Sequence, residues 1–151
     1  MNPYMEMALK EARKGVAEGK GGPFGAVIVK AGKVLSAASN EVLCSHDPTA
    51  HAEIVAIRQA CRKLQTYDLT GSVLYATGEP CPMCLSAIIW ANIQRVYFAS
   101  AAAEAEKIGF RDSGIYRHLR GEDKLLEVEQ IDREEGIALY DEYRRTGKTI
   151  Y

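Results

Sequence analysis

Two short segments of the chain carry residue types that can bind a metal ion and move protons at one point. The first contains His51 and Glu53, and the second contains Cys81 and Cys84. One imidazole and two thiolates suit zinc, and three protein ligands leave its fourth position open for water. Zinc lowers the pKa of such a water to about 7, which provides hydroxide at neutral pH. A site of this kind is catalytic, whereas structural zinc sites are normally closed by four protein ligands.

Glu53 is the candidate general acid and base. A hydrolytic step needs a group that takes a proton from water and returns it to the leaving group, and a carboxylate beside the metal can do both. Positions 51 and 53 do not share a face of a regular helix. We therefore expect the metal to lie at a helix end, where Glu53 can pass beside it.

Other interpretations of these residues stay open. A Cys-x-x-Cys pair can be a redox motif, although such pairs occur in a different strand–helix context. Cys44 or His46 could supply a fourth ligand and close the site into a structural one. Cys44 and Cys61 equally suit small apolar positions. A catalytically silent zinc-binding module is a further alternative, against which the intact Glu53 argues.

The elements that must position these residues follow from the spacing of apolar residues. Helical spacing predicts helices over 3–18, from Asp47-Pro48 onward, from Pro80 to about Asn92, shortly after the loop 109–114, and over 132–145. Alternation and turn residues predict strands over 25–30, 33–38, 72–77, 93–99 and 125–131, with a hairpin turn at Ala31-Gly32. The last two strands are separated by enough chain for a crossover, so we expect them to be parallel. The result is an α/β fold of three layers, αβα, in which a five-stranded mixed sheet has helices on both faces.

Composition indicates one globular domain over residues 1–151, with a C-terminal tail at 146–151. The 19 basic and 20 acidic side chains nearly cancel. This balance argues against a nucleic-acid partner, because phosphate binding requires a basic surface. The first 13 residues lack the apolar core of a signal peptide, and no apolar run is long enough to cross a bilayer. We therefore expect a cytoplasmic protein without membrane contact.

The two chemical segments resemble the signature of the zinc nucleobase deaminases. His51-x-Glu53, followed after a strand by Pro80-Cys81-x-x-Cys84, matches that signature in residue types and in order. Along nearly its whole length the chain most resembles the bacterial guanine deaminases, which have the cytidine-deaminase fold. The matching stretches are 21–26, 47–53, 79–84, 89–91, the loop 108–113 and a C-terminal tyrosine.

The resemblance implies hydrolytic deamination of guanine to xanthine and ammonia by a zinc-activated hydroxide, with Glu53 as the proton shuttle. Asp112 would hold or protonate the amine, and a carboxylate suits the paired N1–H and C2-amine donors of guanine. The implied substrate contacts are Phe24 against the ring, Asn40 and the Ala52 backbone on a ring edge, Trp90 in the pocket wall, and Tyr151 closing the site. Each has a structural alternative: the aromatic residues as core, Asn40 as a turn cap, and Asp112 as a polar loop residue. Arg111 departs from the resemblance, since its charge would alter the pocket if it turned inward.

The resemblance also implies a homodimer that exchanges C-terminal tails, with each tail docked over the partner's active site. The tail ends in the apolar pair Ile150-Tyr151, which is unusual for a free terminus. Docking on its own chain as core cover is the alternative. For the substrate, a tRNA adenosine deaminase is the first rival, because those enzymes share the zinc segments; the aromatic Phe24 and the neutral charge balance argue against it. Cytosine, guanosine and aminotriazines such as ammeline also stay open.

Overall fold

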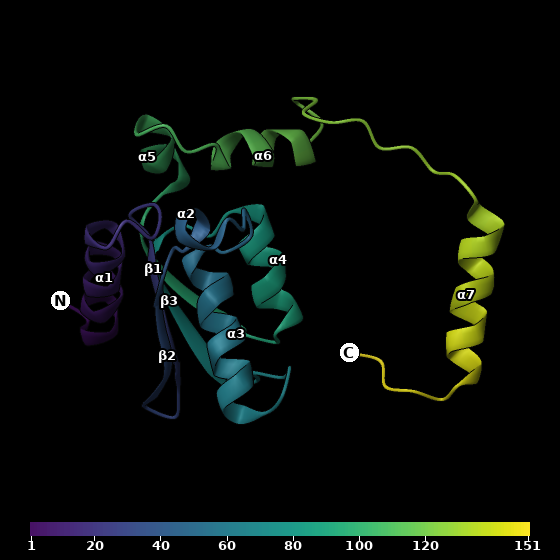
Figure 1. Ribbon diagram of the computed structural model, residues 1–151, viewed down its shortest axis with the longest axis horizontal. Helices are drawn as coiled ribbons and strands as arrows, with labels where there is room; N and C mark the ends of the chain where they lie inside the picture. The colour runs from purple at the N-terminus through teal and green to yellow at the C-terminus, as the bar shows by residue number, and fades with distance from the viewer.

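The computed structural model describes all 151 residues and is built around a four-stranded mixed sheet (Figure 1). The elements in chain order are α1 (Pro3–Ala17), β1 (Gly25–Lys30), β2 (Lys33–Ser39), α2 (Val42–Ser45), α3 (Ala52–Leu64), β3 (Ser72–Gly78), α4 (Pro82–Trp90), β4 (Arg95–Ser100), α5 (Ala102–Lys107), α6 (Asp112–Leu119) and α7 (Arg133–Arg145). The strand order is β2-β1-β3-β4. β1 is antiparallel to both of its neighbours, whereas β3 and β4 are parallel.

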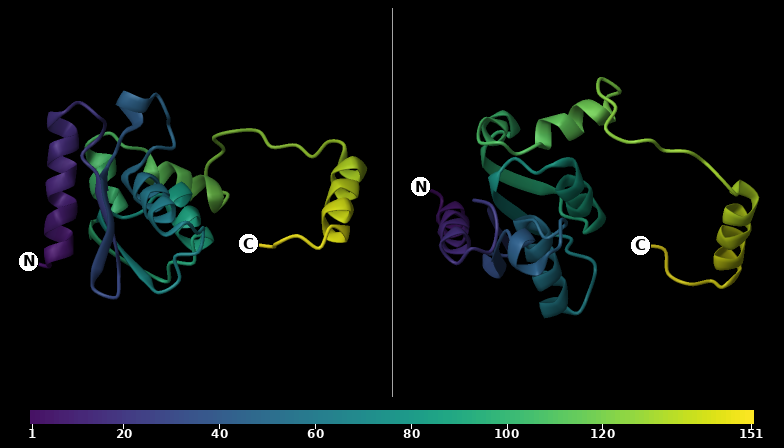
Figure 2. Two further views of the ribbon diagram at one scale, coloured as in Figure 1. Left: turned by 60° about the horizontal axis from the view of Figure 1, so that its bottom comes forward. Right: turned by 45° about the horizontal axis from the view of Figure 1, so that its top comes forward.

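Helices cover both faces of the sheet, as the sequence predicted (Figure 2). On one face, α1 packs against Val27 and Val29 of β1. On the other face, α3 and α4 enclose the larger core, whose bulkiest fully buried members are Ile28, Leu69, Leu74 and Ile88. Because the side chains of β1 alternate between two covered faces, every residue of this strand except Lys30 is buried. This sandwich is the frame on which the starts of α3 and α4 are held.

Most of the predicted elements are confirmed to within a few residues. The hairpin between β1 and β2 turns at Ala31 and Gly32, which both have positive φ values, of 48° and 75°. Two residues of this conformation form the turn whose twist matches that of paired strands. The short helix α2 and the helix α5 were not predicted.

The helix expected from Asp47-Pro48 begins later than predicted. The side chain of Asp47 accepts hydrogen bonds from the backbone N–H of Thr49 at 2.8 Å and from its hydroxyl at 2.6 Å. These bonds close a local turn, a use of aspartate that competes with helix capping. α3 therefore begins at Ala52, after His51.

The fifth strand expected over 125–131 is not formed, and that prediction is wrong. In this chain the segment is exposed and pairs with no strand, so β4 is an edge of the sheet. The chain runs on to α7, which stands apart from the rest of the molecule (Figures 1 and 2). The predicted parallel pairing of the last two strands is consequently absent, and the parallel pair is β3 with β4.

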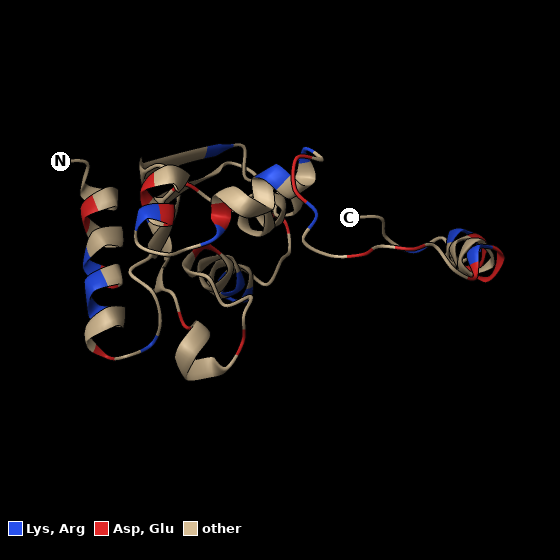
Figure 3. Cartoon of the chain, turned by 90° about the horizontal axis from the view of Figure 1, so that it is seen from above, with Lys and Arg blue, Asp and Glu red and all other residues tan.

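Acidic and basic side chains are interspersed on the surface, and α1 and α7 each carry both signs (Figure 3). The salt bridges that form among them are exposed. None of the helices combines the length and the apolar composition that crossing a membrane requires.

The close approach of α1 to β1 gives a test of this packing. A Cβ atom added at Gly25 would overlap the carbonyl oxygen of Ala8 and lie 2.9 Å from the amide nitrogen of Ala12. We expect Gly25→Ala to lower the free energy of unfolding by about 3 kcal/mol, because backbone atoms of α1 must move. Gly114→Ala is the control, since its Cβ would meet only the end of the Arg117 side chain at 3.6 Å. Equal stability of the two variants in urea unfolding would contradict this packing.

Candidate metal centre and substrate pocket

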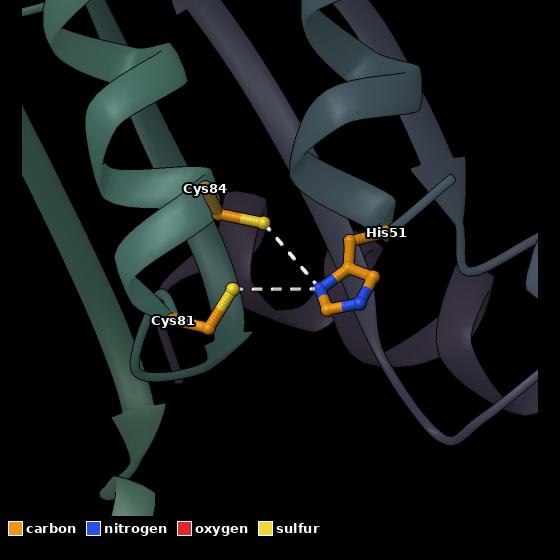
Figure 4. Close-up of side chains that lie close together, drawn as sticks. All are labelled: His51, Cys81 and Cys84. Atoms are coloured by element: carbon orange, nitrogen blue, oxygen red, sulfur yellow. Dashed lines mark hydrogen bonds between the residues drawn. The ribbon is translucent and has the colours of Figure 1, made fainter. Parts of the chain in front are cut away.

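Three side chains that can bind a metal ion converge just beyond the end of β3 (Figure 4). The Nδ1 atom of His51 lies 3.5 Å from Sγ of Cys84 and 3.7 Å from Sγ of Cys81. All three ligand atoms lie within 4.8 Å of one another. In a tetrahedral zinc site, one nitrogen and one sulfur ligand would be about 3.6 Å apart, given the usual Zn–N and Zn–S bond lengths. The donors and their spacing therefore fit zinc.

The local structure of both segments explains this convergence. His51 is the N-cap of α3 and Cys81 is the N-cap of α4, both in an extended conformation with ψ values of 156° and 166°. Pro82 occupies the first helical position of α4, where no backbone N–H is needed. Free N–H groups and the positive dipole end of a helix favour thiolates at such a start.

The extended conformation of His51 also resolves the geometric difficulty with Glu53. Since His51 precedes the helix and Glu53 lies in its first turn, the two need not share a helix face. Both side chains line one cavity, together with Cys81. The expected position of the metal at a helix end therefore agrees with the geometry.

The two cysteine thiols shift each other's pKa values in opposite directions. The hydrogen bond with Cys84 lowers the pKa of Cys81 to about 4. The same bond, with burial, raises the pKa of Cys84. A hydrogen bond with Cys81 raises the pKa of His51. A metal ion held by both sulfur atoms would bind them as thiolates, because cysteine ligands lose their protons on metal binding.

Glu53 lies in the environment that suits an acid–base group. Its side chain is only 7% exposed, and this burial raises the pKa of the carboxyl group to about 7. A group with a pKa near the working pH can both accept and return a proton. A bound cation would favour the ionised form, which is the form that accepts.

The cavity beside the metal ligands has a volume of about 430 Å³, a size usual for small-molecule sites. Phe24, Asn40, Arg111 and Asp112 line it, in addition to the residues named above. Asp112 is the first residue of α6, and burial raises its pKa. The structure thus brings together aromatic, amide and carboxyl side chains from distant parts of the sequence.

Three of the predicted substrate contacts lie outside this cavity in their own chain. Ala52 is buried at the start of α3, where its N–H has no acceptor within the helix. Trp90 lies at the far end of α4 and is 66% exposed. Tyr151 lies beside Trp90 and Tyr67, with ring centroids 6.1 Å apart in each case. None of the three lines the cavity.

The proposed fourth ligands also lie elsewhere. Cys44 is exposed and its thiol donates to the carbonyl oxygen of Glu41 at 3.5 Å. His46 is exposed at the end of α2. Neither belongs to the group of converging ligand atoms, which leaves the site with three protein ligands.

Two cavity residues were missed at the sequence level. The ring of Phe110 meets that of Phe24 edge to face, with centroids 4.8 Å apart. Glu79 also lines the cavity, and its carboxylate accepts a hydrogen bond from the backbone N–H of Ala102 at 2.9 Å. Both lie within the stretches 79–84 and 108–113 that carry the resemblance, two residues before Cys81 and Asp112, and this position was the signal that could have identified them.

Comparison with known proteins identifies the family. Residues 1–100 match the cytidine and deoxycytidylate deaminase zinc-binding region. The chain belongs to this family. Both ligand segments of this zinc-dependent hydrolase lie within the matched region, in agreement with the donor geometry.

The relatives of this deaminase extend the likeness beyond residue 100. It is 42% identical to the guanine deaminase of Bacillus subtilis over 143 residues, which cover 93% of this chain and 92% of that protein. The crystal structure of guanine deaminase from Bacillus subtilis matches all of this chain and 99% of its own, with a TM-score of 0.92 at 41% identity. The tRNA-specific adenosine deaminase of Aquifex aeolicus is 45% identical over 97 residues, 64% of each chain.

The geometry predicts one zinc ion per chain. Cys84→Ser should leave little bound zinc, because the variant loses one of three protein ligands. Cys44→Ser is the matched control and should keep full zinc content, since its thiol is exposed and outside the site. Metal analysis of the purified variants measures both. Equal zinc loss from the two variants would contradict the three-ligand site.

The environment of Glu53 predicts a separate effect on turnover. Glu53→Gln should keep zinc and fold but reduce ammonia release by about 10²- to 10⁴-fold, because an amide cannot carry the proton. Glu6→Gln, at an exposed position in the first turn of α1, should leave the rate unchanged. Full activity of Glu53→Gln in a steady-state assay would show that another group moves the protons.

Proposed function

We propose that this deaminase converts guanine and water into xanthine and ammonia. The observation that carries the proposal is the extent of the match to the guanine deaminase of Bacillus subtilis, which covers 93% of the chain. Such a match must include most of the region after residue 100, which supplies Phe110 and Asp112 to the cavity. The zinc segments alone do not choose among bases, so this later region decides the substrate.

The walls of the cavity suit a flat heterocycle. Phe24 and Phe110 stand edge to face, with an angle of 83° between their rings. One ring can stack on a base while the other closes the side of the cavity, an arrangement that aromatic pairs favour. We propose that Phe24 packs against the purine ring.

The polar groups suit the two edges of guanine. The side-chain oxygen of Asn40 accepts from the backbone N–H groups of Gly22 at 3.3 Å and Val42 at 3.1 Å. Its amide nitrogen is left to donate to the base, and guanine offers the acceptors O6 and N7 on one edge. Asp112 would accept from N1–H and the C2 amine on the other edge. The Ala52 N–H, free at its helix start, is a further donor for the base.

The proton transfers fall to the two carboxyl groups. When bound to His51, Cys81 and Cys84, zinc would supply a water of lowered pKa as the nucleophile toward C2. Glu53 would take a proton from that water and deliver it to the purine ring. Asp112 would hold the amine in place, take the remaining proton from the new C2 hydroxyl group and pass it to the amine, so that the C2–N bond breaks, ammonia departs and the carbonyl of xanthine remains. The burial of Glu53 keeps competing water away from its proton transfers.

A tRNA adenosine deaminase is the alternative function. It is supported by the 45% identity to such an enzyme over 97 residues. The acidic and basic residues mixed along the chain (Figure 3) and the formal net charge of −1 argue against it, because RNA binding depends on a basic surface.

An ammonia-release assay over guanine, guanosine, cytosine, adenine, ammeline and a tRNA substrate tests the proposal. Guanine should be the best substrate, and Asp112→Asn should lower its turnover by about 100-fold, since an amide accepts and donates protons poorly. Asp123→Asn is the control, because Asp123 is exposed near the end of α6 and pairs with Arg117. A much higher rate with cytosine or with tRNA would show that the substrate assignment is wrong.

We further propose that two copies exchange their C-terminal segments. The segment after residue 120 leaves the body of the chain, which Tyr151 at its end meets again at Trp90 and Tyr67, and α7 buries none of its residues. The segment and α7 expose large apolar side chains, namely Leu125, Leu126, Val128, Ile131, Ile137, Leu139 and Tyr140. The body exposes a complementary surface: the free edge of β4, with Tyr97 and Phe98, and an apolar groove along α4. Apolar exposure of this extent marks an interface.

In this arrangement the tail would act on the partner's site. Ile150 and Tyr151 are each 78% exposed in their own chain, so they contribute little to its core. Tyr151 of one copy would close the cavity of the other copy, and Trp90 of the first copy, which lies beside Tyr151, would help to hold the tail there.

A cytoplasmic location, expected from the sequence, would keep the metal-binding thiols reduced.

Deletion of residues 149–151 tests the tail. We expect the shortened chain to keep zinc and most thermal stability but to lose guanine turnover. Co-expression with Glu53→Gln chains should restore activity, because an inactive chain can lend its intact tail to an active site that lacks one. A tail that acts on its own chain would give no restoration, and unchanged kinetics after deletion would rule out any role in closing the site.

A further inference from the structure

We infer that Tyr116 is a positioning residue of the deaminase site, which fixes Asp112 relative to the metal ligand Cys81. The inference rests on the proposed function, in which Asp112 meets the amine of the substrate. Tyr116 itself does not line the cavity. It would act only through the helix that carries Asp112.

The contact is a hydrogen bond between α6 and the metal-binding segment. The hydroxyl of Tyr116 donates to the carbonyl oxygen of Pro80 at 2.8 Å. Pro80 is buried, and its carbonyl belongs to the peptide group that joins it to Cys81. The bond therefore ends on the backbone unit that carries a metal ligand.

The spacing along α6 links this bond to Asp112. Residues four apart lie on the same face of a helix, and Asp112 and Tyr116 have that spacing. α6 has no fully buried residue, so few contacts hold it against the body. On the other side of Asp112, the ring of Phe110 contacts Phe24. Asp112 thus lies between two contacts with the body of the chain: the aromatic contact of Phe110 and the hydrogen bond of Tyr116.

A second tie runs from the same segment to α5. The carboxylate of Glu79 accepts from the N–H of Ala102, the first residue of α5, at 2.9 Å, and α5 packs against α6. Three consecutive residues therefore have three roles. Glu79 holds α5, Pro80 holds α6, and Cys81 is a metal ligand. Because the three residues are consecutive, α5 and α6 are tied to the same short stretch of backbone that carries the metal ligand.

Catalysis depends steeply on such positioning, since a displacement of about 1 Å can reduce a rate by about 100-fold. Removing the hydroxyl of Tyr116 leaves its ring in place and frees one carbonyl group. The metal ligands are untouched. The expected result is a looser α6 and a poorly placed Asp112, without loss of zinc.

The test compares zinc-loaded, full-length Tyr116→Phe and Tyr4→Phe. Tyr4→Phe is the matched control, because the Tyr4 hydroxyl also donates to a backbone carbonyl, that of Gly32 at 3.3 Å, away from the cavity. Amide hydrogen exchange of α6 is measured without substrate. The kcat for guanine is then measured with each tyrosine variant alone and combined with Asp112→Asn.

We expect faster exchange in α6 of Tyr116→Phe only, and a kcat lowered about tenfold, as for the loss of one hydrogen bond. In the Asp112→Asn background this loss should nearly vanish, because coupled residues are not additive. Three results would overturn the inference: unchanged hydrogen exchange in α6, loss of zinc, or a kcat that falls by the same factor with and without Asp112→Asn. If the wild type releases no ammonia from guanine, the proposed function fails, and the exchange measurement alone then decides whether the tie holds α6.

Discussion

The convergence of two helix N-termini beyond β3 is the constraint on which the site depends. His51 and Cys81 each occupy the residue just before a helix, so unpaired N–H groups and the positive ends of both helices meet at one point. Cys81 and Cys84 are buried. Their thiolates would be unfavourable there without the positive helix ends and free N–H groups to offset the negative charge. The requirement explains why α3 and α4 lie on the same face of the sheet, and why Glu53 is buried beside them with a raised pKa.

Two parts of the chain line the cavity: residues 1–100, which include Phe24 and Asn40, and the segment that follows them. The ligands and Glu53 come from residues 1–100, the region that defines the family. Phe110 and Asp112 come from the later segment, which packs over the cavity by few contacts. This division accounts for relatives that share the zinc chemistry but differ in substrate. The position of α6 sets where Asp112 lies relative to the metal ligands. We assign to Tyr116 the role of fixing that position.

The sequence predicted the metal ligands and most of the sheet because both leave strong local patterns. Cys-x-x-Cys after a strand, with a distant His-x-Glu, permits few other structures. Alternation at 125–131 predicted a strand that is not formed, because such a pattern does not show whether a neighbouring strand is available in the same chain. The late start of α3 depends on the Asp47 side chain, which closes a turn instead of capping a helix. Phe110 and Tyr116 were not singled out from the sequence, since their roles depend on contacts between distant segments.

X-ray absorption spectroscopy at the zinc edge of the purified, full-length protein tests the central claim most directly. A zinc ion held by His51, Cys81 and Cys84 with one open position should show two sulfur ligands at about 2.3 Å and two nitrogen or oxygen ligands at about 2.0–2.1 Å. The scattering of a single imidazole should be resolved. A third sulfur or a second imidazole would mean that a fourth protein ligand closes the site, and would contradict the catalytic account.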